Sequence, residues 1–275
     1  MASKKDAIKK LIGAGADIAG SAAGGVVGFL MAGPAGAAMG GAAGPLLSRT
    51  FKTIGEEIDR RVIGPREEVR IGAAYTFAIQ KLQENLSSGN SQKREDAFFE
   101  ESRAGRAAAE EILEGIVLTA QREYEERKVA FLGYLYANIC TNASVTREHA
   151  NQLIKTASNL SFRQFCLLAA LKVRRDREES FTFRLSFALD NASIQKQDVI
   201  AELRDLHQRG LVTLKLETID SGIDDHTSPI DKQGINISSS GLEFYDLLSL
   251  DRLALDDLAP ILQFMSTEDR DSTFP

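Results

Sequence analysis

An uncharged, glycine-rich stretch near the N-terminus constrains this chain more than any other feature. Residues 18–48 contain no charged side chain, and their glycines recur every four residues in two runs separated by Pro34. Because four residues advance an α-helix by about one turn, each run predicts a helix with one smooth face. A face without side chains lets another helix backbone approach closely, which is how helices associate in lipid. The six glycines of this glycine zipper are Gly20, Gly24, Gly28, Gly36, Gly40 and Gly44.

The stretch is long enough to reach across a membrane but only weakly apolar. As a helix, residues 11–33 would be about 35 Å long, against a hydrocarbon core of about 30 Å. The strongly apolar side chains of residues 18–48 favour insertion by roughly 2–4 kcal/mol, and Asp17 at the bilayer centre would cost about 2.5–3.5 kcal/mol. We therefore expect conditional membrane engagement, by a hairpin bent at Pro34 or by copies that pack their glycine faces together. A soluble hairpin packed on the rest of the chain and a disordered linker are the alternatives.

Charge is distributed unevenly along the chain. Residues 1–52 carry six Lys and Arg against two Asp, a net charge of +4, whereas residues 53–157 carry −3 and residues 158–275 carry −7. A basic front on an acidic body favours contact with anionic lipid headgroups. Basic residues on both sides of the zipper would hold both flanks at the inner face of the membrane, with the body in the cytoplasm. These flanking residues are Lys4, Lys5, Lys9, Lys10, Arg49 and Lys52.

A cleaved signal peptide fits this N-terminus less well. Asp17 interrupts the candidate apolar region, and the uncharged run is much longer than the usual signal core. The two cysteines, Cys140 and Cys166, lie in apolar helical patterns and are expected to be buried and reduced.

Residues 53–157 show the apolar spacing of amphipathic helices and no period-two alternation. A second, shorter helix is expected over residues 35–47, where Pro45 closes the second glycine run, and the pattern turns amphipathic from Arg49. Thr146, followed by Glu148 in a first turn, predicts the start of a later helix. The sequence therefore predicts an all-α bundle in this part of the chain.

The last third has a different pattern. A helix over residues 194–209 is followed by Gly210, a typical left-handed cap, and residues 211–217 and 234–238 read as two short strands around a polar loop. Further helices are expected at 241–248 and 253–265, and residues 266–275 read as a flexible tail. The predicted organisation is a hairpin (1–52), a bundle (53–157), an α+β domain (158–265) and the tail.

The α+β segment resembles a winged-helix domain. The residues that carry this resemblance are the L-x-x-L-x-x-R-G-L-V run at 203–212 and the I-S-S-S-G-L-E-F run at 237–244. The resemblance implies that the first run ends a recognition-type helix and that the second leaves the wing. Winged helices bind DNA, proteins or neither, so the resemblance concerns fold more than function. The surface residues that it singles out are Lys196, Gln197, Arg204 and Gln208.

The overall layout also resembles bacterial proteins of the abortive-infection alpha type. The segments that carry this similarity are E-G-I-V-L-T-A at 114–120, F-L-G-Y-L-Y-A-N-I at 131–139 and L-S-F-R-Q-F-C-L-L-A-A-L at 160–171. The resemblance implies a helical region followed by a compact closing domain in an antiviral setting. The glycine zipper is not part of it.

No catalytic, metal or cofactor signature stands out. The glycine-rich segment lacks the lysine of a phosphate-binding loop, and the three histidines are far apart in the chain. The acidic residues between 218 and 232 do not follow the spacing of a calcium loop. We therefore expect a non-enzymatic protein without a cofactor.

Two functional hypotheses follow. The first is a mainly α, membrane-associated protein whose zipper inserts conditionally or forms homo-oligomers, while the helical and winged-helix body binds a protein partner. The second is a soluble winged-helix regulator that binds nucleic acid and uses the hairpin to oligomerise. The recognition-type helix carries three acids against two bases, which disfavours a phosphate-lined groove.

Overall fold

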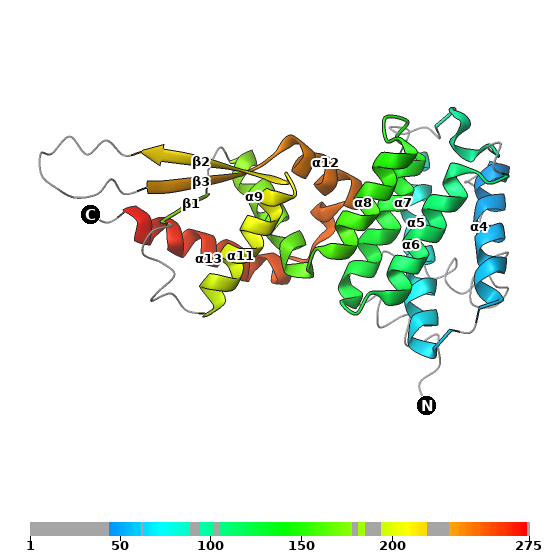
Figure 1. The fold of residues 1–275 in the computed structure, drawn as a ribbon, viewed down its shortest axis with the longest axis horizontal. Helices are drawn as coiled ribbons and strands as arrows, with labels where there is room; N and C mark the ends of the chain where they lie inside the picture. The colour runs from blue at the N-terminus through cyan, green and yellow to red at the C-terminus, as the bar shows by residue number, and fades with distance from the viewer. Residues whose placement is uncertain are drawn as a thin grey trace, which may run out of the picture. The chain divides into compact units, whose positions relative to one another are not determined.

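The structure is a computed structural model that describes residues 44–61, 63–88, 94–101, 105–177, 181–184, 194–218 and 231–273. These residues are mainly helical, as the sequence predicts (Figure 1). The chain divides into two compact units, one of residues 1–160 with 247–249 and one of residues 161–246 with 250–275. The two units are described separately below.

The first unit is all-α in the residues that the structure describes. Figure 1 shows its described α-helices side by side as a bundle. The elements are α4 (Gly44–Asp59), α5 (Pro65–Ser87), η1 (Ala97–Phe99), α6 (Ala108–Arg122), η2 (Glu126–Lys128), α7 (Val129–Cys140) and α8 (Arg147–Asn159).

Helix α4 corrects two sequence predictions. It runs without a break from Gly44 past Arg49 to Asp59, so the break expected between residues 47 and 49 is absent, and Pro45 lies in the first described turn. Proline suits a first turn because its fixed φ is helical and its missing N–H has no helical partner there. The boundary predicted between residues 52 and 53 accordingly falls inside one helix.

The core of the bundle is built from aromatic side chains and one close helix crossing. The ring of Phe51 on α4 lies 5.6 Å from that of Tyr75 and 5.5 Å from that of Tyr136. Helices α5 and α7 approach closely at Gly133, where an added Cβ would lie 2.6 Å from the carbonyl oxygen of Ala74. Glycine at this position therefore sets the distance between the two helices.

The structure confirms the helix start that the sequence predicts at Thr146. Helix α8 begins after Thr146, whose hydroxyl accepts a hydrogen bond from the backbone N–H of His149. Both cysteines are buried and unbridged, as expected.

The second unit combines helices with a small antiparallel sheet in the order β1-β3-β2. In register, Phe181 pairs with Ile235 and Val212 pairs with Ile237. The elements are α9 (Phe162–Asp176), β1 (Phe181–Arg184), α11 (Ile194–Gln208), β2 (Val212–Thr218), β3 (Asp231–Ile237), α12 (Ser239–Leu248), η3 (Leu250–Arg252) and α13 (Leu255–Thr273).

The turn after α11 agrees with the sequence prediction, and two other features do not. Gly210 has φ of 75°, in the left-handed region where glycine is favoured. Strand β1 was missed, because four residues beside a charged run give too short a pattern to recognise. Helix α13 continues to Thr273, where a flexible tail was expected from residue 266. Once a helix is nucleated, each further residue adds one hydrogen bond, so polar residues can extend it.

No helix among the described residues is both long enough and apolar enough to cross a membrane.

Candidate functional site

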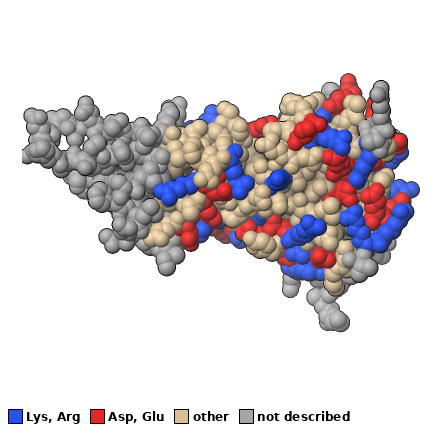
Figure 2. Space-filling model, in the orientation of Figure 1, with Lys and Arg blue, Asp and Glu red and all other residues tan. Residues whose placement is uncertain are grey.

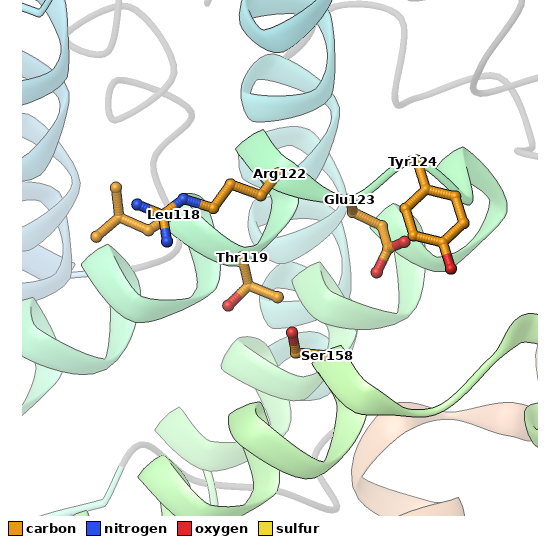
Figure 3. A pocket seen from close by; sticks show the side chains of 6 residues that line it. All are labelled: Leu118, Thr119, Arg122, Glu123, Tyr124 and Ser158. Carbon is orange, nitrogen blue, oxygen red and sulfur yellow. The ribbon is translucent and has the colours of Figure 1, made fainter.

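A small pocket opens in the first unit where helix α6 ends. Its volume is about 240 Å³, and Figure 3 shows that its side chains come from the last turns of α6, from the segment after α6 and from the end of α8. The pocket therefore gathers residues that are about 40 positions apart in sequence. It is lined by Leu118, Thr119, Arg122, Glu123, Tyr124 and Ser158.

The wall of the pocket contains a buried ion pair. The Glu123 carboxylate lies 2.6 Å from the Lys128 ammonium, and the two side chains are only 4% and 2% exposed. Its other oxygen accepts a hydrogen bond from the backbone N–H of Glu125, and Lys128 also donates to the carbonyl oxygen of Ser158. A buried ion pair contributes little net stability, since desolvating two charges is costly. Its position beside a pocket makes it a candidate for recognition.

Two helix C-termini meet at this pocket. Helix α6 ends at Arg122 and helix α8 ends at Asn159, one residue after Ser158. The last carbonyl groups of a helix carry a partial negative charge. Lys128 and Arg122 supply positive charge to this region, so the pocket contains both signs.

Tyr124 stands at the edge of the pocket. Its side chain is 84% exposed, and the only other large hydrophobic residue so exposed in the described part of the chain is Leu255. An aromatic ring that solvent reaches on a rim is suited to contact with a ligand or partner, because it offers both an apolar face and a hydroxyl group.

The arrangement offers several groups that can bind a polar molecule. It places a carboxylate, a guanidinium, two hydroxyls and an aromatic ring around one space, which is typical of recognition of a small polar molecule. No group of His, Cys, Asp and Glu among the described residues has the arrangement of a metal site.

Most of the predicted zipper lies outside the described residues. Gly44, its last glycine, is the first residue of α4. The positions outside are Gly20, Gly24, Gly28, Pro34, Gly36 and Gly40, together with the flanking Lys4, Lys5, Lys9 and Lys10.

The basic residues that follow the zipper are exposed but paired. Arg49 forms an ion pair with Glu101, and Lys52 lies 3.9 Å from Glu56 on the next turn of α4. The face of the bundle in Figure 2 likewise shows Lys and Arg interspersed with Asp and Glu rather than a patch of one sign. Lipid headgroups would therefore have to compete with intramolecular partners for these two side chains.

The predicted winged-helix surface lies on α11. Gln197, Arg204 and Gln208 are exposed, and Lys196 belongs to the same helix. Two acids of this helix are engaged with α9. Glu202 accepts hydrogen bonds from Ser161 and from the Arg163 guanidinium, and Asp205 accepts from Gln164 and Arg209.

These hydrogen bonds shift the pKa values of Arg163 and Asp205. The hydrogen bond from Arg163 to Glu202 raises the pKa of that guanidinium despite its partial burial. Burial of the Asp205 carboxyl opposes its ionisation, but hydrogen bonds from Arg209 and Gln164 outweigh burial and lower its pKa. Both acids already have hydrogen-bond partners on α9, which weakens the sequence-based count of acids against bases on this helix.

Sequence reasoning missed the pocket. The run Glu123–Lys128 reads as a charged helix end, and nothing in the linear order shows that one glutamate and one lysine are buried against the end of α8. A Tyr between two Glu directly after an apolar helix was the one visible signal.

Comparisons with known proteins found no match to this chain among protein-family models, curated proteins or solved structures.

Proposed function

We propose that this chain is a non-enzymatic, membrane-associated protein whose glycine zipper engages the bilayer conditionally and self-associates. The observation that carries the proposal is the uncharged, glycine-gridded stretch of residues 18–48 with basic residues on both flanks. The sequence resemblance to abortive-infection alpha-type proteins supports the further proposal of a role in bacterial antiviral defence, with the zipper as the membrane-perturbing element.

Helix α4 supports a mechanical link between the zipper and the bundle. It starts at the last zipper glycine, Gly44, and buries Phe51, Ile54 and Ile58 in the bundle core. A force or rearrangement at the zipper would thus act directly on a core helix. Homo-oligomers formed through the glycine faces would bring bundles together at the inner face of the membrane.

The second unit is proposed to be a winged-helix-like domain that binds a protein partner. The element order α9, β1, α11, β2, β3 and the antiparallel sheet order β1-β3-β2 support this, with the β2–β3 connection in the place of a wing. Exposed Gln197, Arg204 and Gln208 on α11 provide polar recognition groups.

Membrane fractionation tests the first part. The full-length chain should remain in the pellet after alkaline extraction, and a variant that lacks residues 1–43 should become soluble. The deletion stops at residue 43 because removal of residues 1–52 would also take Phe51 out of the core. If both forms are extracted equally, the membrane proposal is wrong.

A substitution pair tests the glycine faces. Gly24→Leu with Gly40→Leu should abolish crosslinked oligomers, while Ala22→Leu with Ala38→Leu places the same leucine side chains on the opposite helix faces and should leave them intact. Equal loss in both variants would contradict zipper packing.

Nucleic-acid binding by the second unit is the alternative function. It is favoured by the engagement of Glu202 and Asp205 with α9, since this leaves Arg204 exposed on α11 beside fewer uncompensated acids. A salt-dependent mobility shift of duplex DNA that is lost in Arg204→Gln would support it.

A further inference from the structure

We infer that the pocket at the end of α6 binds a small zwitterion of the free amino acid class. Its ammonium group would lie beside Glu123 and Tyr124, and its carboxylate would lie beside Arg122. The inference is independent of the membrane proposal, because it depends only on the groups that line this pocket in the first unit.

The two charged groups that line the pocket lie apart from each other. In Figure 3 the Arg122 guanidinium lies near Leu118 on one side of Thr119, and the Glu123 carboxylate lies on the other side, next to Tyr124. A ligand that crosses the pocket over Thr119 would therefore meet opposite charges at its two ends.

The Glu123 end is suited to an ammonium group. A carboxylate accepts about four hydrogen bonds, and Glu123 accepts one from Lys128 and one from the backbone of Glu125. The exposed ring of Tyr124 adds a cation–π surface at the rim. The partial negative charges at the C-terminal ends of α6 and α8 also favour a positively charged group here.

A ligand of one charge fits less well than a zwitterion. A simple cation beside Glu123 would leave the Arg122 guanidinium without a negative partner. A simple anion would face the Glu123 carboxylate and the two helix C-termini. Only a molecule that carries both charges satisfies both ends, and the hydroxyls of Thr119 and Ser158 can then bond to its polar atoms.

The size of the pocket limits the ligand. Its volume of about 240 Å³ is below the range of about 300–1,000 Å³ that is typical of sites for drug-sized molecules. It corresponds to roughly eight water molecules at liquid density. This space suits an amino acid and is too small to enclose a dinucleotide or a folded peptide.

The test is a binding screen on the full-length protein. The common L-amino acids are added singly in a thermal-shift assay, and the strongest binder is measured by calorimetry beside its amide, which lacks the carboxylate, and its N-acetyl form, which lacks the ammonium. We expect at least a tenfold loss of affinity for each derivative. If no amino acid stabilises the protein, or if either derivative binds as well as the parent, the inference is wrong.

Variants locate the site. Arg122→Gln should weaken binding at least tenfold and Tyr124→Ala several-fold, and both side chains are exposed, so the fold should persist. Arg127→Gln removes the same charge from an exposed neighbour that does not line the pocket, and it should bind normally. Unchanged affinity in Arg122→Gln would overturn the assignment of the carboxylate end. Glu123→Gln would disrupt the buried ion pair with Lys128 and could destabilise the fold, so Arg122→Gln and Tyr124→Ala are used to test the site.

Discussion

The two units use charged residues in different ways. In the first unit, several ion pairs join elements that are distant in sequence, such as Arg61 with Glu114 and Arg147 with Glu111, beside local pairs such as Lys52 with Glu56. In the second unit, two pairs lie within one helical turn, Lys172 with Asp176 and Arg209 with Asp205, and the Arg163–Glu202 pair joins two helices. Long-range pairs specify which helices are neighbours, whereas local pairs only support the helix that contains them.

The two units also differ in how they shift the pKa of a partly buried carboxyl group. Burial of the Glu114 carboxyl opposes its ionisation, but hydrogen bonds from Arg106 and Arg61 outweigh burial and lower its pKa. Burial of the Asp246 carboxyl raises its pKa, with further contributions from Asp251 and Asp176, although Lys172 opposes them. The bundle compensates its carboxylate with two arginines, whereas the second unit gathers acids around one lysine.

The largest effect is expected at the buried pair of the bundle. Lys128→Met leaves the Glu123 carboxylate buried without its partner and should destabilise the bundle by about 3–5 kcal/mol. The matched change in the second unit, Arg163→Met, removes a pair whose arginine is 40% exposed and should cost about 1 kcal/mol or less. Urea unfolding followed by circular dichroism, with hydrogen exchange to assign the loss to a unit, measures both. Equal losses would contradict the difference between the units.

The second largest effect is expected from overpacking at two glycines, one in each unit, and the two losses of stability should be similar. Gly133→Ala would place a Cβ 2.6 Å from a backbone oxygen of α5, and Gly241→Ala would place one 2.0 Å from the carbonyl oxygen of Leu211. Each should cost about 1–3 kcal/mol through overpacking, measured by thermal unfolding. Gly115→Ala is the control, since its nearest neighbour is the terminal methyl of Ile154 at 3.3 Å. A loss in the control equal to that at Gly133 would rule out close approach as the cause.

Acidification should change the stability contributions of Glu114 in the first unit and Asp246 in the second unit in opposite directions. Because the folded pKa of Glu114 is lowered, its stabilisation is present above its unfolded value of about 4.5 and is lost as pH falls through the folded pKa. Asp246 has a raised folded pKa, so its protonated form favours the fold and that contribution is lost as pH rises through the folded pKa. As the pH falls below about 4.5, hydrogen exchange should show that the amides of α6 lose protection. The Glu114→Gln variant should not show this pH-dependent loss. Protection near α12 should not show the same loss.

The smallest effect concerns one tyrosine of the second unit. Burial raises the pKa of Tyr245 to about 12, with further contributions from Asp251, Asp246 and Asp176. Spectrophotometric titration should lose a late ionisation step in Tyr245→Phe, and Asp251→Asn should shift that step to lower pH. A step that stays in place in Asp251→Asn would show that the acids around Lys172 do not act on this ring.

The sequence by itself determined much of the local structure. The apolar spacing of α5 to α8, the cap at Thr146 and the glycine turn after α11 all depend on interactions within a few residues, which the linear order records. The alternation that predicted β2 and β3 is equally local. The glycine zipper and its basic flanks are also properties of the sequence alone, and the membrane hypothesis rests on them.

The tertiary structure decided what depends on distant neighbours. The burial of Glu123 with Lys128, the pocket beside them and the close approach at Gly133 arise because separate helices pack together. Helix α4 continues through the predicted boundary because Phe51 is held between rings of α5 and α7, and no local pattern encodes that contact. Local patterns specify each element, but the environment of a side chain is set by elements that the linear order does not place beside it.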